Sequence, residues 1–202
     1  MRPGWADLEY TDKSFDEADL SEMRFERCSF AHCRFVDARL SESVISFCRF
    51  EECDFSRARM NAAILSDCSL AGCSFRNPDL FMSHFTNCRM LGSTFVEARM
   101  DGITISGGDW SWVSMRYQDL HDLNLSAIIL VEADLYGADL TKSDFRDADL
   151  TRANMGRAKL GEADLRGAIL TGVDLREADV KGARMDIAQA VHFARCYGAK
   201  IE

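Results

Sequence analysis

A repeat of five residues governs this chain and excludes the ordinary secondary structures. Between Ala133 and Val180 a small residue, usually alanine, stands two positions before a large apolar one, and each large residue has a number divisible by five. Five residues of α-helix rotate a side chain by about 500°, so successive large residues would lie roughly 140° apart and share no face. In a straight strand they would alternate between opposite faces. A chain that buries them all must therefore turn a corner in each repeat and wind into a solenoid.

The same frame extends over almost the whole chain. Apolar residues occupy every fifth position from Tyr10 to Met185, which makes 36 consecutive pentads without an insertion or a deletion. Units of the form A-D-L-x-x, as at 133–137 and 148–152, are the mark of pentapeptide-repeat proteins, which this chain resembles. The resemblance implies an all-β fold, a right-handed quadrilateral β-helix with about four pentads per turn and short strands stacked in parallel. We expect a lead-in at 1–9, the β-helix at 10–185, and a C-terminal helix and dimerisation segment at 186–202.

The composition fits one elongated domain that does not enter a membrane. Of the 202 residues, 47% are hydrophobic and 28% are charged. No run of about 18 apolar residues exists for a membrane span. The first residues lack the apolar region of a secretory signal. We therefore expect a cytoplasmic protein.

Most of the cysteines belong to the repeat. Seven of the eight fill the small inward position: Cys28, Cys33, Cys48, Cys53, Cys68, Cys73 and Cys88. In a four-pentad turn they would form two columns of buried thiols. Parallel side-chain directions and a reducing compartment argue against disulfides, and the close cysteine pairs typical of zinc sites are absent from the sequence. We expect reduced thiols, no metal and no cofactor.

The sequence does not favour catalysis. All four histidines lie outside the inward positions, and the adjacent pairs Ser83-His84 and His32-Cys33 would point to opposite faces of an extended segment. The glycines at 107 and 108 lie inside the repeat and do not form a phosphate-binding loop. We expect a binding protein, not an enzyme.

Acidic residues are concentrated in one part of the chain. Residues 10–100 contain 14 acids and 11 bases, whereas residues 101–150 contain ten acids and three bases. Several of these aspartates directly precede a central residue, and aspartates in register on a rigid rod resemble the phosphates of duplex DNA. An alternative is that they stabilise turns and keep the protein soluble. The candidate binding residues are Asp101, Asp109, Asp119, Asp122, Asp134, Asp139, Asp144, Asp147 and Asp149.

The segment from Ile103 to Ile128 departs from the small-residue rule. Most of its small positions hold residues too large for a regular coil, such as Val113 and Leu123, so we expect a distorted section there. Trp112, in the same segment, lies off the inward positions. It is either a contact anchor for a partner or a cap over the distorted coil.

The C-terminal segment leaves the repeat and predicts a short helix. Asp186 is a suitable N-cap, apolar residues follow at helical spacing, and Gly198 can close the helix. A helix of about 11 residues is marginal alone, and the last coil exposes pairing edges. The helix should therefore cover that coil, recruit a second copy of the chain, or both. The predicted dimer interface is Ile187, Ala190, Val191, Phe193, Ala194 and Tyr197.

Four blocks of sequence resemble the MfpA and Qnr family of fluoroquinolone-resistance proteins, and the MfpA group most of all. They are residues 16–21, 90–96, 122–125 and 182–191. The resemblance implies a homodimer joined through the C-terminal segment, a DNA-like shape and charge, and binding to DNA gyrase without direct nucleic-acid binding. The unbroken repeat leaves no room for the projecting loops of Qnr proteins, which favours an MfpA-like mode.

The sequence is also compatible with two other functions. The protein could be a scaffold for an unrelated partner, or a self-immunity factor against a natural product that targets gyrase.

Overall fold

Each pentad turns its corner at the second residue after the central one. The backbone there is left-handed in nearly every repeat of the computed structural model, which describes residues 4–201: φ is 60° at Glu17 and 56° at Arg157. A positive φ is uncommon for residues other than glycine, because the Cβ crowds the carbonyl oxygen. The requirement that every central side chain point inward outweighs that local cost.

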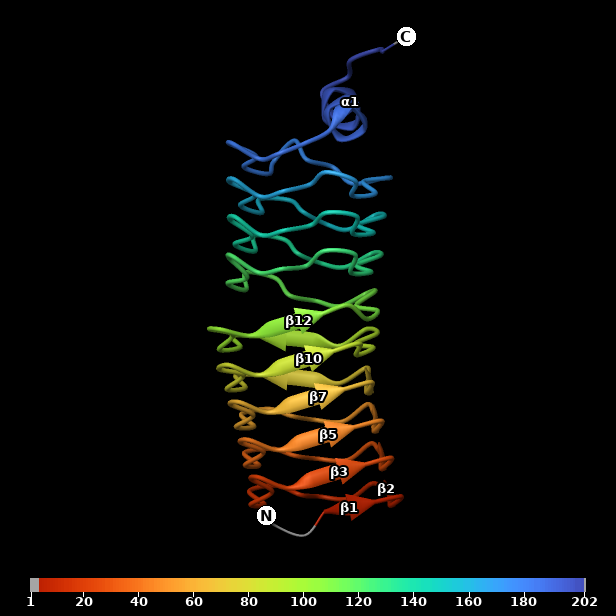
Figure 1. Ribbon diagram of the computed structural model, residues 1–202, viewed down its shortest axis with the longest axis vertical. Helices are drawn as coiled ribbons and strands as arrows, with labels where there is room; N and C mark the ends of the chain where they lie inside the picture. The colour runs from red at the N-terminus through yellow and green to blue at the C-terminus, as the bar shows by residue number, and fades with distance from the viewer. Residues whose placement is uncertain (1–3, 202) are drawn as a thin grey trace. The chain divides into compact units, whose positions relative to one another are not determined.

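The sides of the coils are short strands that pair in parallel with the next coil (Figure 1). Phe25 lies opposite Ile45, and His84 lies opposite Thr104, so the register is 20 residues. The expected β-helix is therefore confirmed. The elements are β1 Trp5–Ala6, β2 Glu9–Thr11, β3 Arg24–Glu26, β4 Ser29–Ala31, β5 Val44–Ser46, β6 Arg49–Glu51, β7 Ile64–Ser66, β8 Ser69–Ala71, β9 Ser74–Arg76, β10 His84–Thr86, β11 Thr94–Val96, β12 Thr104–Ser106 and α1 Ile187–Cys196.

The strands form three parallel sheets, one for each of three sides of the coil. Their orders are β1-β3-β5-β7-β10-β12, β2-β4-β6-β8 and β11-β9. In the second half of the chain the coils pair through single parallel bridges with the same 20-residue register, such as Asp119 opposite Asp139 and Asp144 opposite Asp164.

The central residues form the core. All of them from Leu20 to Leu175 are buried. Where phenylalanines recur in one column, their rings stack: Phe35 lies 4.9 Å from Phe55, and Phe75 lies 4.7 Å from Phe95, with nearly parallel planes. These distances match the spacing of paired strands, ~4.8 Å. Burial of each large side chain contributes roughly 1.5–3 kcal/mol, so the stacked columns hold the coils together.

The chain divides into two compact units, Met1–Asp109 and Trp110–Glu202, where the sequence predicted one repeat domain. The division falls in the segment that was expected to be distorted. Gly107 and Gly108 are consecutive left-handed residues, with φ of 63° and 93°. A Cβ at Gly108 would lie 2.1 Å from the carbonyl oxygen of Cys88, so only glycine fits there. The backbone is therefore irregular at this point, and its conformation requires glycine at position 108.

The β-helix also starts earlier than the predicted boundary at Tyr10. β1 already pairs with β3 in the 20-residue register, with Trp5 opposite Phe25. The ring of Trp5 lies 5.3 Å from that of Phe25, edge to face, which extends the apolar core to this coil. Residues 1–3 of the predicted lead-in lie outside the described residues.

The helix α1 closes the second unit with polar side chains, not with its apolar face. Asp186 is its N-cap, as predicted, and forms a capping box with Gln189. The Gln189 amide donates to the carbonyl of Ala168 (2.9 Å), and Nε2 of His192 lies 2.7 Å from the carbonyl oxygen of Val173. These carbonyls belong to the last coil and would otherwise face a further coil. The helix thus satisfies the open edge.

Among the residues that the structure describes, no helix is long and apolar enough to cross a membrane.

Candidate functional site

The aspartates that precede the central residues are built into the turns. Oδ1 of Asp139 accepts the backbone N–H of Thr141 (3.2 Å), and Oδ1 of Asp149 accepts that of Thr151 (2.9 Å). The same bond recurs at Asp119, Asp134 and Asp144. Asn154 makes it with an amide oxygen. The expected turn role is present, but it does not require a charge, so the charge of these aspartates is available for another purpose.

Bases from neighbouring coils offset part of the acidic charge. Nζ of Lys159 lies 2.9 Å from Oδ2 of Asp139, and Nη1 of Arg116 lies 2.8 Å from Oδ2 of Asp134. Lys159 stands outside the acidic stretch 101–150 in sequence. Counted by compact unit, Met1–Asp109 carries 18 acids and 12 bases, and Trp110–Glu202 carries 15 acids and 12 bases. The second unit, with a net charge of −3, is therefore less acidic than the first, with −6, although it contains most of the acidic stretch.

Two carboxylates of the second unit that are paired with bases, those of Asp164 and Asp139, have a lowered pKa. Hydrogen bonds from Arg166 hold the pKa of Asp164 at about 2. At Asp139 partial burial opposes ionisation, but hydrogen bonds from Thr141 and Lys159 outweigh it and also hold the pKa at about 2.

The structure brings only some of the candidate acids together. Asp119 and Asp139 are neighbours in one column. Asp134 lies beside Asn154, Asp144 beside Asp164, and Asp149 beside Ile169, each in a different column. Columns five residues apart belong to successive sides of the coil. The candidates in the second unit are therefore spread around it. Asp101 and Asp109 belong to the first unit, and Asp122 and Asp147 stand at left-handed corners.

Two pairs of residues that could do chemistry, Ser83 with His84 and Cys196 with His192, are not arranged for it. Ser83 is buried and donates to the carbonyl of Leu80, whereas His84 is exposed. Sγ of Cys196 lies 3.6 Å from Nε2 of His192, but that nitrogen is engaged with the Val173 carbonyl and so carries its proton. It cannot accept the thiol proton. Within residues 4–201 no cluster of three or more histidine, cysteine or acidic side chains is placed to hold a metal ion.

The seven inward cysteines occupy the two columns that the spacing predicts. All seven are buried and none forms a disulfide, while Cys196 is half-buried. The backbone N–H of Cys28 lies 3.4 Å from Sγ of Cys48, one coil further on. Burial raises the pKa of the Cys28 and Cys33 thiols. These thiols act as small core residues.

The outer face of α1 carries most of the predicted dimer residues. Ile187 is 84% exposed and Tyr197 is 61% exposed. Ala190 is exposed too, and Val191, Phe193 and Ala194 are half-buried. The ring of Phe193 packs on that of Tyr197 at 5.1 Å. The helix therefore turns an apolar stripe away from the coil.

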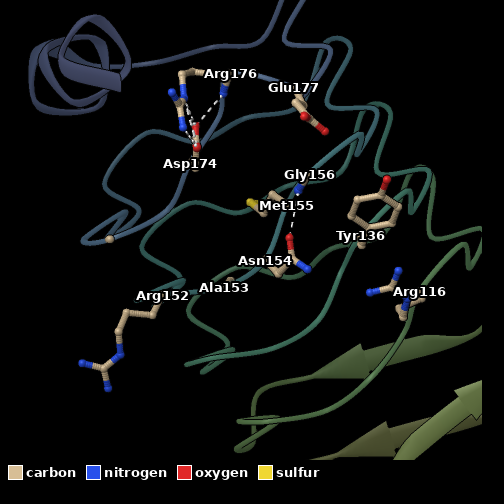
Figure 2. Close-up of a pocket in the computed structure, with 11 residues that line it drawn as sticks. Arg116, Tyr136, Arg152, Ala153, Asn154, Met155, Gly156, Asp174, Arg176 and Glu177 are labelled. Carbon is tan, nitrogen blue, oxygen red and sulfur yellow. Dashed lines mark hydrogen bonds and ion pairs between the residues drawn. The ribbon is translucent and has the colours of Figure 1, made fainter. Parts of the chain in front are cut away.

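A groove on one side of the second unit is absent from the sequence predictions. It has a volume of about 910 Å³ and lies between Tyr136 and Arg176, with Gly156 between them (Figure 2). Arg116 stacks over the Tyr136 ring at 4.5 Å. Arg116, Tyr136, Gly156 and Arg176 are each 20 residues apart in the sequence. Their common position in the 20-residue register was the only feature of the sequence that could have predicted the groove.

The repeat assignment is decided by a family comparison. A model of pentapeptide repeats, in eight copies, matches residues 14–46, 38–77, 119–157 and 148–186. The chain belongs to the pentapeptide-repeat family. No curated protein sequence matches this pentapeptide-repeat protein.

Solved structures share the fold. A trypsin-treated form of QnrB1, a plasmid-mediated fluoroquinolone resistance protein, has a TM-score of 0.86 at 24% identity, with 98% of this chain and 100% of QnrB1 covered. Full-length QnrB1 has a TM-score of 0.62 at 23% identity, with 97% and 100% covered. At these identities the likeness shows that this pentapeptide-repeat protein has the Qnr type of fold. The predicted closeness to MfpA stays a prediction.

Proposed function

We propose that this protein binds DNA gyrase through its acidic surface, modulates or inhibits the enzyme, and protects it against quinolone-type poisons. The observation that supports this most is the likeness in fold to QnrB1 over 98% of the chain, because QnrB1 is a fluoroquinolone resistance protein. The net charge of −9 agrees with a partner that normally holds nucleic acid. The protein acts as a cytoplasmic binding protein without catalysis or a cofactor.

The proposed mechanism is mimicry of duplex DNA. Carboxylates fixed by turn hydrogen bonds, such as Asp119 and Asp139, have little rotational freedom left to lose when a partner binds. A gyrase groove that holds phosphates with lysine and arginine would accept them. The same negative charge would repel nucleic acid, so the protein itself does not bind it. The uninterrupted repeat supports an MfpA-like mode, in which no projecting loop takes part.

The test is inhibition of supercoiling by purified gyrase, with and without a fluoroquinolone. Two fourfold variants remove equal charge, and asparagine keeps the turn acceptor at the four test positions, as Asn154 shows. The test set is Asp119→Asn, Asp134→Asn, Asp139→Asn and Asp144→Asn. The control set, in the first unit, is Asp16→Asn, Asp19→Asn, Asp37→Asn and Asp54→Asn. We expect the test set alone to lose potency. Equal loss in both sets, or in neither, would reject the central acids as the contact surface.

We also propose that two copies join through the exposed stripe of α1. The polar face of the helix is already occupied by the last coil, and Ile187 and Tyr197 stay largely exposed on the other side, where Phe193 covers only part of the Tyr197 ring. Val191→Glu with Phe193→Glu should give monomers whose β-helix is intact by circular dichroism. An unchanged dimer mass in light scattering would place the interface elsewhere.

If wild-type protein does not affect gyrase at all, the scaffold function for an unrelated partner is preferred. If it protects gyrase against a peptide or natural-product toxin but not against fluoroquinolones, self-immunity is preferred.

A further inference from the structure

The side of the second unit that holds the groove carries aromatic residues at strained corners. Trp112 and Tyr117 flank this side, and both are left-handed with φ of 57°. Large side chains rarely adopt that conformation because of its steric cost. Both are nevertheless exposed, Trp112 by 56% and Tyr117 by 66%. The fold imposes this conformation at nearly every corner, so the exposure of two aromatic rings is what marks this side of the second unit.

The aromatic rings are also held in place. A Cβ at Gly137 would lie 2.5 Å from Cε1 of Tyr117, so the Tyr117 ring occupies the space that a side chain at position 137 would take. The Tyr117 ring meets the Tyr136 ring edge to face at 5.6 Å, and Arg116 covers Tyr136. Aromatic and arginine side chains that pack on one another in this way are enriched in the hot spots of protein interfaces.

The groove beside these rings exists because two glycines interrupt the columns of side chains. Gly156 stands between Tyr136 and Arg176, and Gly172 follows Arg152 in the corner column. Figure 2 shows the Tyr136 ring and the backbone of Gly156 on one side, and Arg176 bound to Asp174 on the other. The result is an open trough with an aromatic wall and guanidinium groups along its rim.

The arginines of the rim can exchange their present partners. Arg152 pairs with Glu132, and Arg176 pairs with Asp174, but the side chains of both arginines are more than 60% exposed. Exposed ion pairs of this kind contribute little free energy. A carboxylate from another molecule can therefore replace an internal one, and a guanidinium binds it through two parallel hydrogen bonds. Arginine outnumbers acid in the lining, three to two.

We propose that this groove binds an extended segment of another protein that carries a carboxylate next to an aromatic side chain. The carboxylate would pair with Arg152 or Arg176, and the aromatic ring would lie against Tyr136 over Gly156. The site is separate from the turn aspartates at 119 and 139 and does not depend on gyrase binding.

A direct binding measurement tests this proposal. The probe is a fluorescein-labelled hexapeptide of alternating glutamate and tyrosine, followed by fluorescence polarisation, with a lysine–tyrosine hexapeptide for comparison. Gly156→Gln should fill the trough, because its Cβ would lie 3.1 Å from the Tyr136 ring. Gly161→Gln is the matched control: it has the same place in its pentad on the next side, and its Cβ would find only ordinary contacts. Neither glycine has a positive φ.

We expect wild type to bind the glutamate peptide, Gly156→Gln to bind it at least about tenfold more weakly, and Gly161→Gln to match wild type. Arg152→Gln changes an exposed side chain and should also weaken binding of the glutamate peptide. It replaces Gly156→Gln as the test variant if Gly156→Gln does not fold. The proposal is overturned if wild type prefers the lysine peptide or binds neither, or if the foldable groove variants bind as tightly as wild type.

Discussion

At the scale of single residues, each pentad has positions that the fold restricts and positions that it leaves free to vary. The central residue must be large and apolar, whereas the left-handed corner tolerates almost any side chain, from Glu17 to Trp112. The residue before the centre supplies a turn acceptor, for which aspartate and asparagine serve equally, as at Asp134 and Asn154. Function can therefore vary at the corner and before the centre without changing the coil.

Thiol chemistry gives the first prediction at this scale. With native protein, a thiol reagent such as DTNB should modify Cys196 and leave the seven inward cysteines intact, because those are buried and Cys196 is not fully so. All eight should react in denaturant. Intact mass should show reduced, metal-free protein. Rapid native reaction of more than one thiol, or bound zinc in stoichiometric amount, would contradict the packing role.

Acid stability gives the second. Hydrogen bonds from Arg166 and Arg176 hold the pKa of Asp164 and of Asp174 at about 2, against 3.8 for an ordinary aspartate. A lowered native pKa stabilises the fold above the unfolded pKa, and that stabilisation is lost as pH falls toward the native value. The urea midpoint should therefore fall between about pH 4 and pH 2.

The variant Asp164→Asn should flatten that acid dependence. Its control is Glu162→Gln, an exposed carboxyl that makes no ion pair with the described residues 4–201. If both variants keep the full wild-type slope, the Asp164–Arg166 pair does not contribute to the acid response.

At the scale of elements, α1 shows that a solenoid end needs polar groups more than apolar ones. The last coil presents backbone carbonyls, and the side of α1 that faces them carries Gln189, His192 and Cys196 at helical spacing. The apolar residues consequently point outward. The sequence predicted the helix and its N-cap, but it did not identify Gln189 and His192 as the side chains that contact the last coil.

Loss of the buried amide should loosen this end of the protein. Gln189→Ala removes the bond to Ala168 and half of the capping box, and should cost about 1–3 kcal/mol because a buried carbonyl is left unpaired. Hydrogen exchange in the last coil, 165–185, should accelerate. Ala188→Gln, at an exposed position of the same helix, is the control and should exchange as wild type does. Equal protection in both variants would show that α1 does not secure the edge.

At the scale of the whole molecule, charge is organised by columns and not by stretches of sequence. The acidic stretch 101–150 is offset in the second unit by Lys159 and Arg152 from the adjoining coil. What remains is a protein with an overall charge of −9, and a groove in its second unit that is lined by more arginine than acidic side chains and by Tyr136. Two kinds of contact surface thus coexist on one fold.

Binding of gyrase through the acidic surface should depend on the salt concentration. Inhibition of gyrase through exposed carboxylates should weaken steadily from low to physiological ionic strength, because the Debye length shortens to about 8 Å at 0.15 M. The fourfold asparagine variant of the first unit, at Asp16, Asp19, Asp37 and Asp54, should keep the wild-type salt dependence. The fourfold variant at Asp119, Asp134, Asp139 and Asp144 should lose most of it. Inhibition that does not change with salt would mean that apolar contacts dominate, and would remove the case for DNA mimicry.

The sequence alone determined the solenoid, the cysteine columns and the N-cap at Asp186. It could do so because a period of five, sustained from Tyr10 to Met185, leaves one way to bury every large residue. The tertiary structure decided what the surface is. Stacking brings residues 20 apart to within ~4.8 Å, so Lys159 meets Asp139, and Gly156 opens a groove beside Tyr136. It also decided that α1 docks through Gln189, because the unpaired carbonyls of the last coil exist only once the coils have formed.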